Sequence, residues 1–192
     1  MKNDEKIIFR LAKIDDAEKL VEIYAPYVKN TNITFEYEVP IIDEFKQRIT
    51  KIMSKFPYIV VCIGDEIVGY TYASTFRERQ AYNWCVETSI YINEKYQGRK
   101  IGEILYTKLE AILKLQNITN LVASITYPNP QSIAFHEKFK KIAHFTKCGY
   151  KQNCWYDMVF MEKMINKHET LAKEIIYLPD LDKNLVEKIL KK

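Results

Sequence analysis

Hydrophobic and polar positions along this chain of 192 residues follow two different periods. Short runs rich in β-branched and aromatic residues are typical of strands. They predict strands at residues 6–12, 58–63, 66–73, 84–93, 121–126, 142–145 and 154–161. Apolar residues spaced three and four apart are typical of amphipathic helices. They predict helices at residues 17–28, 43–52, 101–116, from 130 onward, and 181–190. Residues 15–18 have the form of a capping box before the first helix.

The order of these elements indicates the fold class. A strand, two helices and a hairpin come first, then strand-helix-strand-helix, then a closing antiparallel pair. A mixed sheet with helices on both faces accounts for this order. The length suits one domain with an appendage. The apolar stripe after Pro179 predicts a C-terminal helix that packs on its own domain or on a dimer mate. Its short length and lack of aromatic residues disfavour a membrane contact.

Composition and charge exclude several classes of protein. A hydrophobic content of 47% is enough for a core, and the net charge of +4 is dispersed, which disfavours nucleic-acid binding. Four cysteines form no CxxC pair and three histidines form no paired ligand pattern, so no metal site is expected. Unpaired cysteines on strand-like segments indicate reduced thiols and a cytoplasmic protein. No run approaches the ~20 apolar residues of a membrane span, and no signal peptide is recognisable.

The stretch from Glu87 to Leu105 is the most informative part of the chain. It runs from a β-rich strand, through a loop with two glycines and two cations, into an amphipathic helix. A helix N-terminus presents unpaired backbone N–H groups and the positive end of the helix dipole. The pattern therefore predicts an anion site where this helix begins.

The loop Gln97-x-x-Lys100-x-Gly102 resembles the loop of GNAT-type N-acetyltransferases that cradles the pyrophosphate of acetyl-CoA. It matches neither the dinucleotide-binding nor the P-loop pattern. The resemblance implies acetyl-CoA as the co-substrate and implies a set of binding residues. These are Ile90, Tyr91, Ile92, Gln97, Gly98, Arg99, Lys100, Ile101, Gly102, Asn129 and Ser132. For Asn129 and Ser132, a helix cap and a first-turn polar residue are an equally good explanation.

Further motifs, in order along the chain, resemble the phosphinothricin and methionine sulfoximine N-acetyltransferases. They lie at residues 34–36, 76–84, 87–91, 128–132, 136–137, 149–151 and 155–157. The resemblance implies an α+β GNAT-type fold, with a central mixed, mostly antiparallel, twisted sheet of about seven strands. It implies a GNAT domain at residues 1–165, followed by an amphipathic helical extension at 166–192. It also implies a homodimer that acetylates a small amino-acid-like substrate.

The same resemblance implies two catalytic residues. Glu87 is expected to be the general base, because an ammonium group cannot attack a thioester until it loses a proton. His136 is expected to handle a proton nearby, either beside the base or at the leaving thiolate. Without the resemblance, Glu87 is a solvated strand residue, and His136 packs beside Phe135 and Phe139.

The resemblance further implies an acceptor pocket formed by Phe35, Arg77, Arg79, Tyr82 and Tyr91. Arginine donors suit a substrate that carries a carboxylate and a second anionic or polar group. Without the resemblance, the loop at 74–83 is a solvated basic segment.

Two departures from the family pattern bear on activity. Lys100 occupies a position usually held by glycine, which predicts backbone strain if φ is positive there. A Gly-Phe pair is absent after Phe139, which predicts a shorter helix at His136 or a shifted strand after it. Two other functions remain open: acetylation of an ordinary amino acid or peptide terminus, and a non-catalytic acyl-CoA-binding module.

Overall fold

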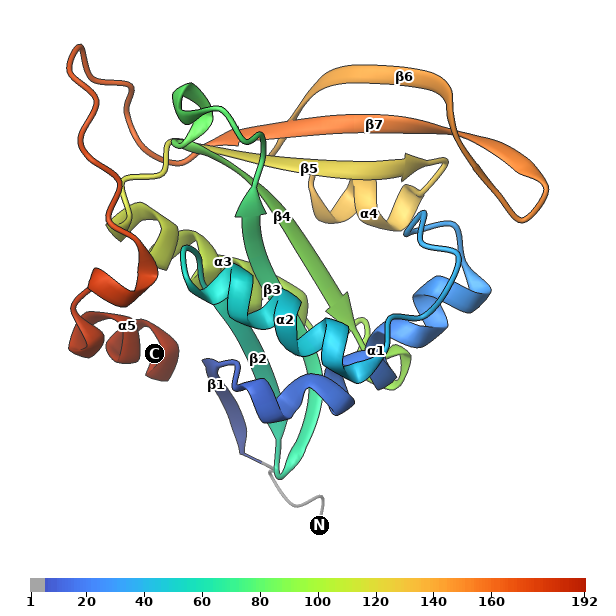
Figure 1. Ribbon diagram of the computed structural model, residues 1–192, viewed down its shortest axis with the longest axis horizontal. Helices are drawn as coiled ribbons and strands as arrows, with labels where there is room; N and C mark the ends of the chain where they lie inside the picture. The colour runs from blue at the N-terminus through green and yellow to red at the C-terminus, as the bar shows by residue number, and fades with distance from the viewer. Residues whose placement is uncertain (1–5) are drawn as a thin grey trace.

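The computed structural model describes residues 6–192, so residues 1–5 of the predicted domain lie outside the described part. A single seven-stranded sheet has the order β1-β2-β3-β4-β5-β7-β6 (Figure 1). The strands are β1 (Ile7–Leu11), β2 (Tyr58–Ile63), β3 (Glu66–Thr75), β4 (Cys85–Ile92), β5 (Asn120–Tyr127), β6 (Lys140–Lys151) and β7 (Cys154–Met164). The α-helices are α1 (Ala17–Asn30), α2 (Ile42–Met53), α3 (Ile101–Leu115), α4 (Pro130–Phe135) and α5 (Lys183–Lys191).

The sheet is antiparallel except at its centre. Strands β4 and β5 are parallel and pair over three positions only, from Cys85 opposite Asn120 to Glu87 opposite Val122. Beyond Glu87, β4 continues beside β3, and β5 continues beside β7. The two central strands therefore splay apart after Glu87. The predicted α+β fold, with a mixed and mostly antiparallel sheet, is confirmed.

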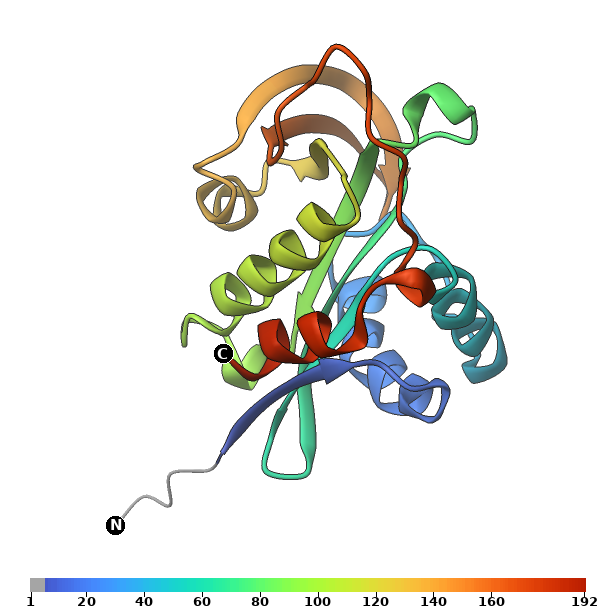
Figure 2. The same ribbon diagram turned by 90° about the vertical axis from the view of Figure 1, so that its left-hand side faces the viewer.

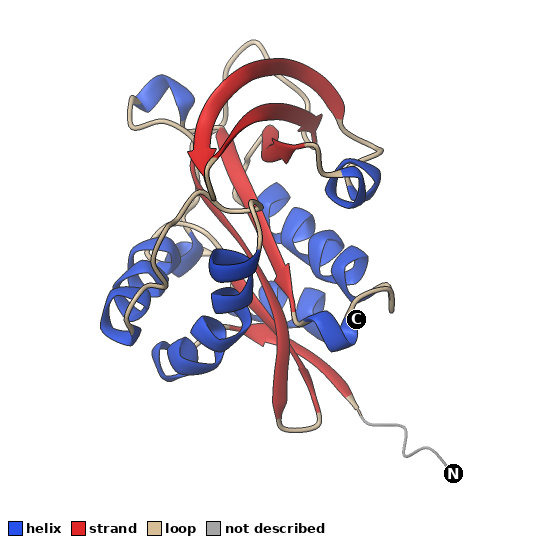
Figure 3. Cartoon of the chain, turned by 90° about the vertical axis from the view of Figure 1, so that its right-hand side faces the viewer, coloured by secondary structure: helices blue, strands red, loops and turns tan. Residues whose placement is uncertain are grey.

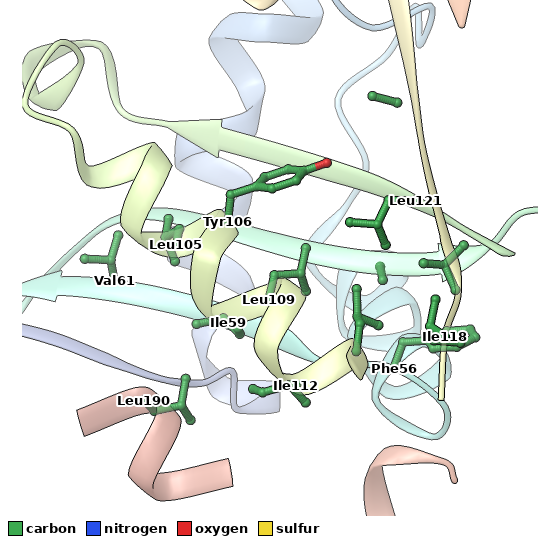
Figure 4. Close-up of a cluster of buried hydrophobic side chains, with 14 of the residues drawn as sticks. Phe56, Ile59, Val61, Leu105, Tyr106, Leu109, Ile112, Ile118, Leu121 and Leu190 are labelled. Atoms are coloured by element: carbon green, nitrogen blue, oxygen red, sulfur yellow. The ribbon is translucent and has the colours of Figure 1, made fainter. Parts of the chain in front are cut away.

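Helices cover both faces of the sheet, and alternation along each strand sorts the core into two layers (Figures 2 and 3). In β2, Ile59 and Val61 are buried with α3, whereas Tyr58 and Val60 are buried with α1 and α2. Every residue of β2 is buried, because helices lie on both of its sides. The close-up in Figure 4 shows the layer around Leu109 of α3.

The C-terminal segment is part of the same domain core. Leu178, Leu181, Val186 and Leu190 are buried in the α3 layer, and Figure 4 shows Leu190 among those side chains. The ammonium group of Lys108 on α3 donates to the carbonyl of α5 residue Ile189 at 2.9 Å, and α5 packs on α3 and β1. The predicted helix thus packs on its own domain. Within residues 6–192, no helix is long and apolar enough to cross a membrane.

Two local predictions, the length of β6 and the capping box, differ from the structure, and a third, the end of α4, agrees with it. Strand β6 spans 12 residues instead of four, because pairing with β7 extends it through bulges and through polar residues that hydrophobicity does not mark. Helix α4 ends at Phe135, one residue before His136, as the missing Gly-Phe pair suggested. The capping box at 15–18 does not form. The Asp16 carboxylate instead accepts from the Lys13 N–H and pairs with Arg10, both at 2.7 Å.

Candidate active site

A cavity of about 410 Å³ lies where β4 and β5 splay, between the N-termini of α3 and α4. Nine of the eleven predicted cofactor residues line it: Ile90, Ile92, Gln97, Gly98, Lys100, Ile101, Gly102, Asn129 and Ser132. The other two do not. Tyr91 faces the opposite side of β4, and the exposed Arg99 guanidinium lies 5.1 Å from the centre of the Tyr96 ring.

The anion-binding end of this cavity is the loop before α3. Gly98 has φ of 73°, and Lys100 has φ of 61° and ψ of 6°, so both lie in the left-handed region. Lys100 therefore adopts the conformation that favours glycine, as predicted, at a cost of about 1–2 kcal/mol. The first N–H groups of α3 have no partner within the helix and point out of its N-terminus. Together with the Lys100 ammonium group, they suit a pyrophosphate.

Sequence reasoning missed six residues that line the same cavity: Tyr27, Ile33, Tyr96, Glu103, Gln131 and Phe135. Tyr27 links α1 to this wall, because its hydroxyl donates to the Ile92 carbonyl at 2.5 Å and accepts from the Gln97 amide at 3.0 Å. Gln131 on α4 donates to Gln97 at 3.3 Å, which joins the two helix N-termini. The position of Gln131 next to the predicted cap of α4 was the only sequence signal for this group.

Asn129 caps α4. Its side-chain oxygen accepts from the Ser132 N–H at 3.0 Å, as the cap interpretation predicts. Both residues also line the cavity, so the two interpretations of this pair hold together.

Glu87 is the last residue of β4 that pairs with β5, and its side chain is half-buried. Side chains alternate along a strand, so Glu87, Ser89 and Tyr91 point to the face covered by α1 and α2. Tyr91 packs there against Tyr24, with ring centres 4.9 Å apart. Glu87 therefore lies at the edge of the splay, on the face opposite α3.

His136 lies on the α3 side and is only 5% exposed. The rings of Tyr106, Phe135 and Phe139 surround it, with centres 5.0–5.6 Å away. Burial lowers its pKa, and Nδ1 donates to the Ser132 carbonyl at 2.8 Å. The hydroxyl of Tyr106 in turn bonds the Thr88 side chain. The structure thus places His136 and Glu87 on opposite faces of the sheet and does not bring them into contact.

The predicted acceptor residues are divided between two places. Phe35 packs against β6 at Gly149, which has no side chain to block the Phe35 ring. Arg77 and Arg79 are exposed, and the Arg77 guanidinium lies 5.9 Å from the centre of the Tyr82 ring. Tyr82 lines a second cavity, of about 730 Å³, between this loop and the segment at 166–173.

The second cavity is closed partly by a link between the acceptor loop and the C-terminal segment. The indole N–H of Trp84 donates to the carbonyl of Lys173 at 2.7 Å. The segment at 166–173 thus contacts and supports the loop that carries Arg77 and Arg79.

Comparison with known proteins identifies the family. A family model described as an acetyltransferase (GNAT) domain matches residues 9–160. The chain belongs to the GNAT acetyltransferases. The match begins within β1, ends within β7, covers the elements between them and leaves α5 outside.

Several relatives narrow the comparison within the GNAT acetyltransferases. A phosphinothricin N-acetyltransferase of Streptomyces viridochromogenes is 28% identical over 80% of this chain and 85% of that protein. An L-methionine sulfoximine/L-methionine sulfone acetyltransferase of Pseudomonas aeruginosa is 25% identical over 80% of this chain and 91% of that protein. Among solved structures, a phosphinothricin acetyltransferase from Sinorhizobium meliloti in complex with AcCoA has a TM-score of 0.82. It is 30% identical and covers 91% of this chain and 96% of its own.

These findings confirm the predicted family, the fold, the N-acetyltransferase class and acetyl-CoA as co-substrate. The cavity fits that assignment, because its loop end suits a pyrophosphate and its Ile90, Ile92 and Phe135 wall suits an apolar arm.

Proposed function

We propose that this GNAT acetyltransferase acetylates the α-amine of phosphinothricin, methionine sulfoximine or a similar small anionic amino acid. The names of its relatives support this choice of acceptor. The observation that carries the proposal is the position of Glu87. It stands at the point where β4 leaves β5, at the edge of the splay that also opens onto the cofactor cavity from the α3 side.

In the proposed mechanism, acetyl-CoA supplies the thioester from which the acetyl group is transferred. Glu87 accepts one proton from the substrate ammonium group, directly or through water, and so frees the amine lone pair. The amine forms the new C–N bond, the C–S bond breaks, and the thiolate takes up a proton. A backbone N–H near Tyr91 stabilises the charge that develops on the carbonyl oxygen. Transfer is direct, because no serine or cysteine here belongs to a nucleophile motif.

The proposed role of His136 follows from its hydrogen bond. A carbonyl oxygen can only accept, so Nδ1 carries the proton that it donates to Ser132. In the neutral form, Nε2 is then the free acceptor. This supports proton uptake by His136 over proton donation to the thiolate. Because Glu87 is on the other face, a joint role requires water in the splay.

The proposed acceptor site lies on the Glu87 side of the sheet. Phe35 and Tyr91 supply aromatic walls, and Arg77 and Arg79 supply positive charge at the entrance for the substrate carboxylate. Positive charge there disfavours a polyamine acceptor. We also propose a homodimer and a cytoplasmic location, as the resemblance and the free thiols suggest. Light scattering after size-exclusion chromatography tests the dimer.

Release of CoA thiol from acetyl-CoA tests the proposed function. Phosphinothricin, methionine sulfoximine, methionine sulfone and ordinary amino acids serve as acceptors. Glu87→Gln should lower kcat by about 10²–10⁴-fold with unchanged acetyl-CoA binding, because it removes only the base. Glu22→Gln, at an exposed position on α1, is the matched control.

Each alternative outcome is informative. Full turnover in Glu87→Gln would assign the base to another group. Rapid CoA release with ordinary amino acids alone would show that the acceptor is an ordinary amino acid and not phosphinothricin or methionine sulfoximine. Acetyl-CoA binding without turnover of any amine would indicate that the protein is an acyl-CoA-binding module and not an enzyme.

A further inference from the structure

A small recess lies beneath α1 and α2 on the Glu87 side of the sheet. It has a volume of about 30 Å³, and tyrosines dominate its walls. We call it the tyrosine recess; its lining residues are Tyr24, Phe45, Arg48, Ile52, Tyr58, Tyr70, Tyr72 and Tyr91. A space of this size holds one water-sized group.

Two hydroxyl groups in the tyrosine recess have no hydrogen-bond partner. They belong to Tyr58 and Tyr70, which are each 1% exposed. Burial raises the pKa of both phenols well above the ordinary value, so both stay protonated and can donate. A buried donor without an acceptor costs free energy that a bound acceptor group recovers.

Two other polar side chains that line the recess, Tyr24 and Arg48, already have partners. The Tyr24 hydroxyl bonds the Thr34 hydroxyl at 2.7 Å. The Arg48 guanidinium donates to Glu36 at 2.7 Å and to Glu44 at 2.6 Å. Among the fully buried side-chain polar atoms of residues 6–192 that line the recess, those without a partner are the Tyr58 and Tyr70 hydroxyls, whereas Tyr72 and Tyr91 lie on its half-buried side.

Stacking holds the two donors in place. The ring of Tyr58 stacks on that of Tyr72 with centres 4.9 Å apart, and on that of Tyr70 at 5.5 Å. Tyr91 adds a further ring contact to Tyr70 at 5.3 Å. Donors fixed by such packing lose little entropy when they bind a ligand.

The register of the sheet sets the distance from the recess to the proposed base. Glu87 and Ser89 lie on the same face of β4, and Tyr72 of β3 is directly opposite Ser89. Tyr58 is opposite Tyr72, at the level of Ser89, and Tyr70 is opposite Tyr91, so the two donors lie about 7 Å and about 14 Å along β4 from Glu87. Tyr72 and Tyr91 are half-buried, so they form the accessible side of the tyrosine recess. Along β4, the nearer level, that of Tyr58, is within the span of a short amino-acid side chain.

We propose that the tyrosine recess binds the hydrogen-bond-accepting end of the acceptor's side chain. A sulfone, sulfoximine or phosphinate oxygen has the size and the lone pairs to accept from Tyr58 and Tyr70. The α-amine then lies at Glu87. This inference rests on the proposed function. It assigns to the tyrosine recess the selection of side chains with a sulfone, sulfoximine or phosphinate oxygen over the thioether side chain of methionine. A site built around donors rejects analogues that lack the acceptor.

The test compares two acceptors that differ only in the group at issue, methionine sulfone and methionine. Tyr58→Phe, Tyr70→Phe and the double variant remove the donors and keep the rings. The double variant should lower kcat/KM for the sulfone about tenfold relative to methionine. The KM for acetyl-CoA should not change. Tyr177→Phe, whose ring packs on Phe56 in another part of the core, is the matched control.

Thermal unfolding of the same proteins without substrate supplies a second measurement. The Phe variants should melt no lower than the wild type, because the hydroxyls have no partner in the free protein. An unchanged sulfone preference in both single variants and the double variant would overturn the proposal and leave a recess that holds water alone. A lower melting temperature would likewise overturn it, since the hydroxyls would then serve the core. A wild type that acetylates neither acceptor would instead remove the proposed function, and the recess assignment with it.

Discussion

The cofactor cavity and the acceptor face meet at the β4–β5 splay but are built in different ways. The cavity comes mainly from two continuous segments, residues 90–103 and 129–135. The acceptor face combines residues from distant elements, such as Phe35, Tyr58, Glu87 and Gly149. A local motif can encode the first, whereas only the register of the whole sheet produces the second.

Each region contains one glycine beside an aromatic ring. On the acceptor face, a β-carbon at Gly149 would overlap the ring of Phe35. In the cofactor cavity, a β-carbon at Gly102 would lie 3.2 Å from the ring of Phe135 and 3.4 Å from Ile90. Alanine at these two positions therefore probes the two regions separately.

Gly149→Ala should have the largest effect. The new methyl group has no room, so Phe35 must move, at a cost of about 1–3 kcal/mol in unfolding free energy. The KM for the amino-acid acceptor should rise about tenfold or more, whereas the KM for acetyl-CoA should stay the same. Steady-state kinetics and urea denaturation measure both effects.

Gly64→Ala is the control for Gly149→Ala. Gly64 has φ of 58° and open space around it, so alanine strains the backbone without touching the site. It should lower stability by about 1–2 kcal/mol and leave both KM values unchanged. A Gly149→Ala enzyme with normal acceptor KM would show that Phe35 lies outside the acceptor pocket.

Gly102→Ala should have a smaller effect than Gly149→Ala and should change the KM for acetyl-CoA and not the KM for the amino-acid acceptor. Alanine favours a helix by about 1 kcal/mol over glycine, which offsets the close contact with Phe135. Stability should stay within about 1 kcal/mol of wild type, while the KM for acetyl-CoA rises about threefold to tenfold because Phe135 moves into the cavity. A rise in the acceptor KM instead would contradict the division between the two regions.

The smallest expected effect is a change in the pH dependence of stability at His136, which packs on the α3 side of the sheet, where the cofactor cavity lies. Its folded-state pKa is lowered by burial, so the unfolded chain binds a proton more readily near neutral pH. Stability should therefore fall as the pH drops from about 7.5 to about 5.5, through the ordinary histidine pKa near ~6.5. His136→Phe should lose less stability over that range. His168→Gln, on an exposed histidine, is the control, and identical pH slopes for wild type and His136→Phe would contradict the prediction.

The contrast explains which parts of the molecule the sequence predicts. The cofactor loop was predictable because strand period, glycines and helix period lie within one short stretch that ends at Leu105. The sequence also marked Lys100 as a position where a positive φ would bring strain, and the structure has φ of 61° there. Strand β6 was underestimated, because an exposed edge strand lacks the apolar pattern and is defined by its partner.

The tyrosine recess had no local signal, whereas the packing of His136 beside Phe135 and Phe139 was expected from the sequence and is found in the structure. Tyr58 and Tyr70 look like ordinary strand residues, and only the pairing of β2 with β3 and the helices above bring their hydroxyls together. The spacing of His136 from Asn129 places it near the C-terminal end of α4 but does not indicate the face of the sheet that it joins. Tertiary packing decides both.

The two tryptophans give this division an optical signature. Trp84 ends the acceptor loop and is bonded to Lys173, and Trp155 is 59% exposed on β7 beside Tyr150. Neither lines the cofactor cavity. Intrinsic fluorescence at the red edge of excitation should therefore follow the loop and the β6–β7 hairpin, and should respond more to the amino acid than to acetyl-CoA. The protein thus carries its own reporter of acceptor binding, without an added label.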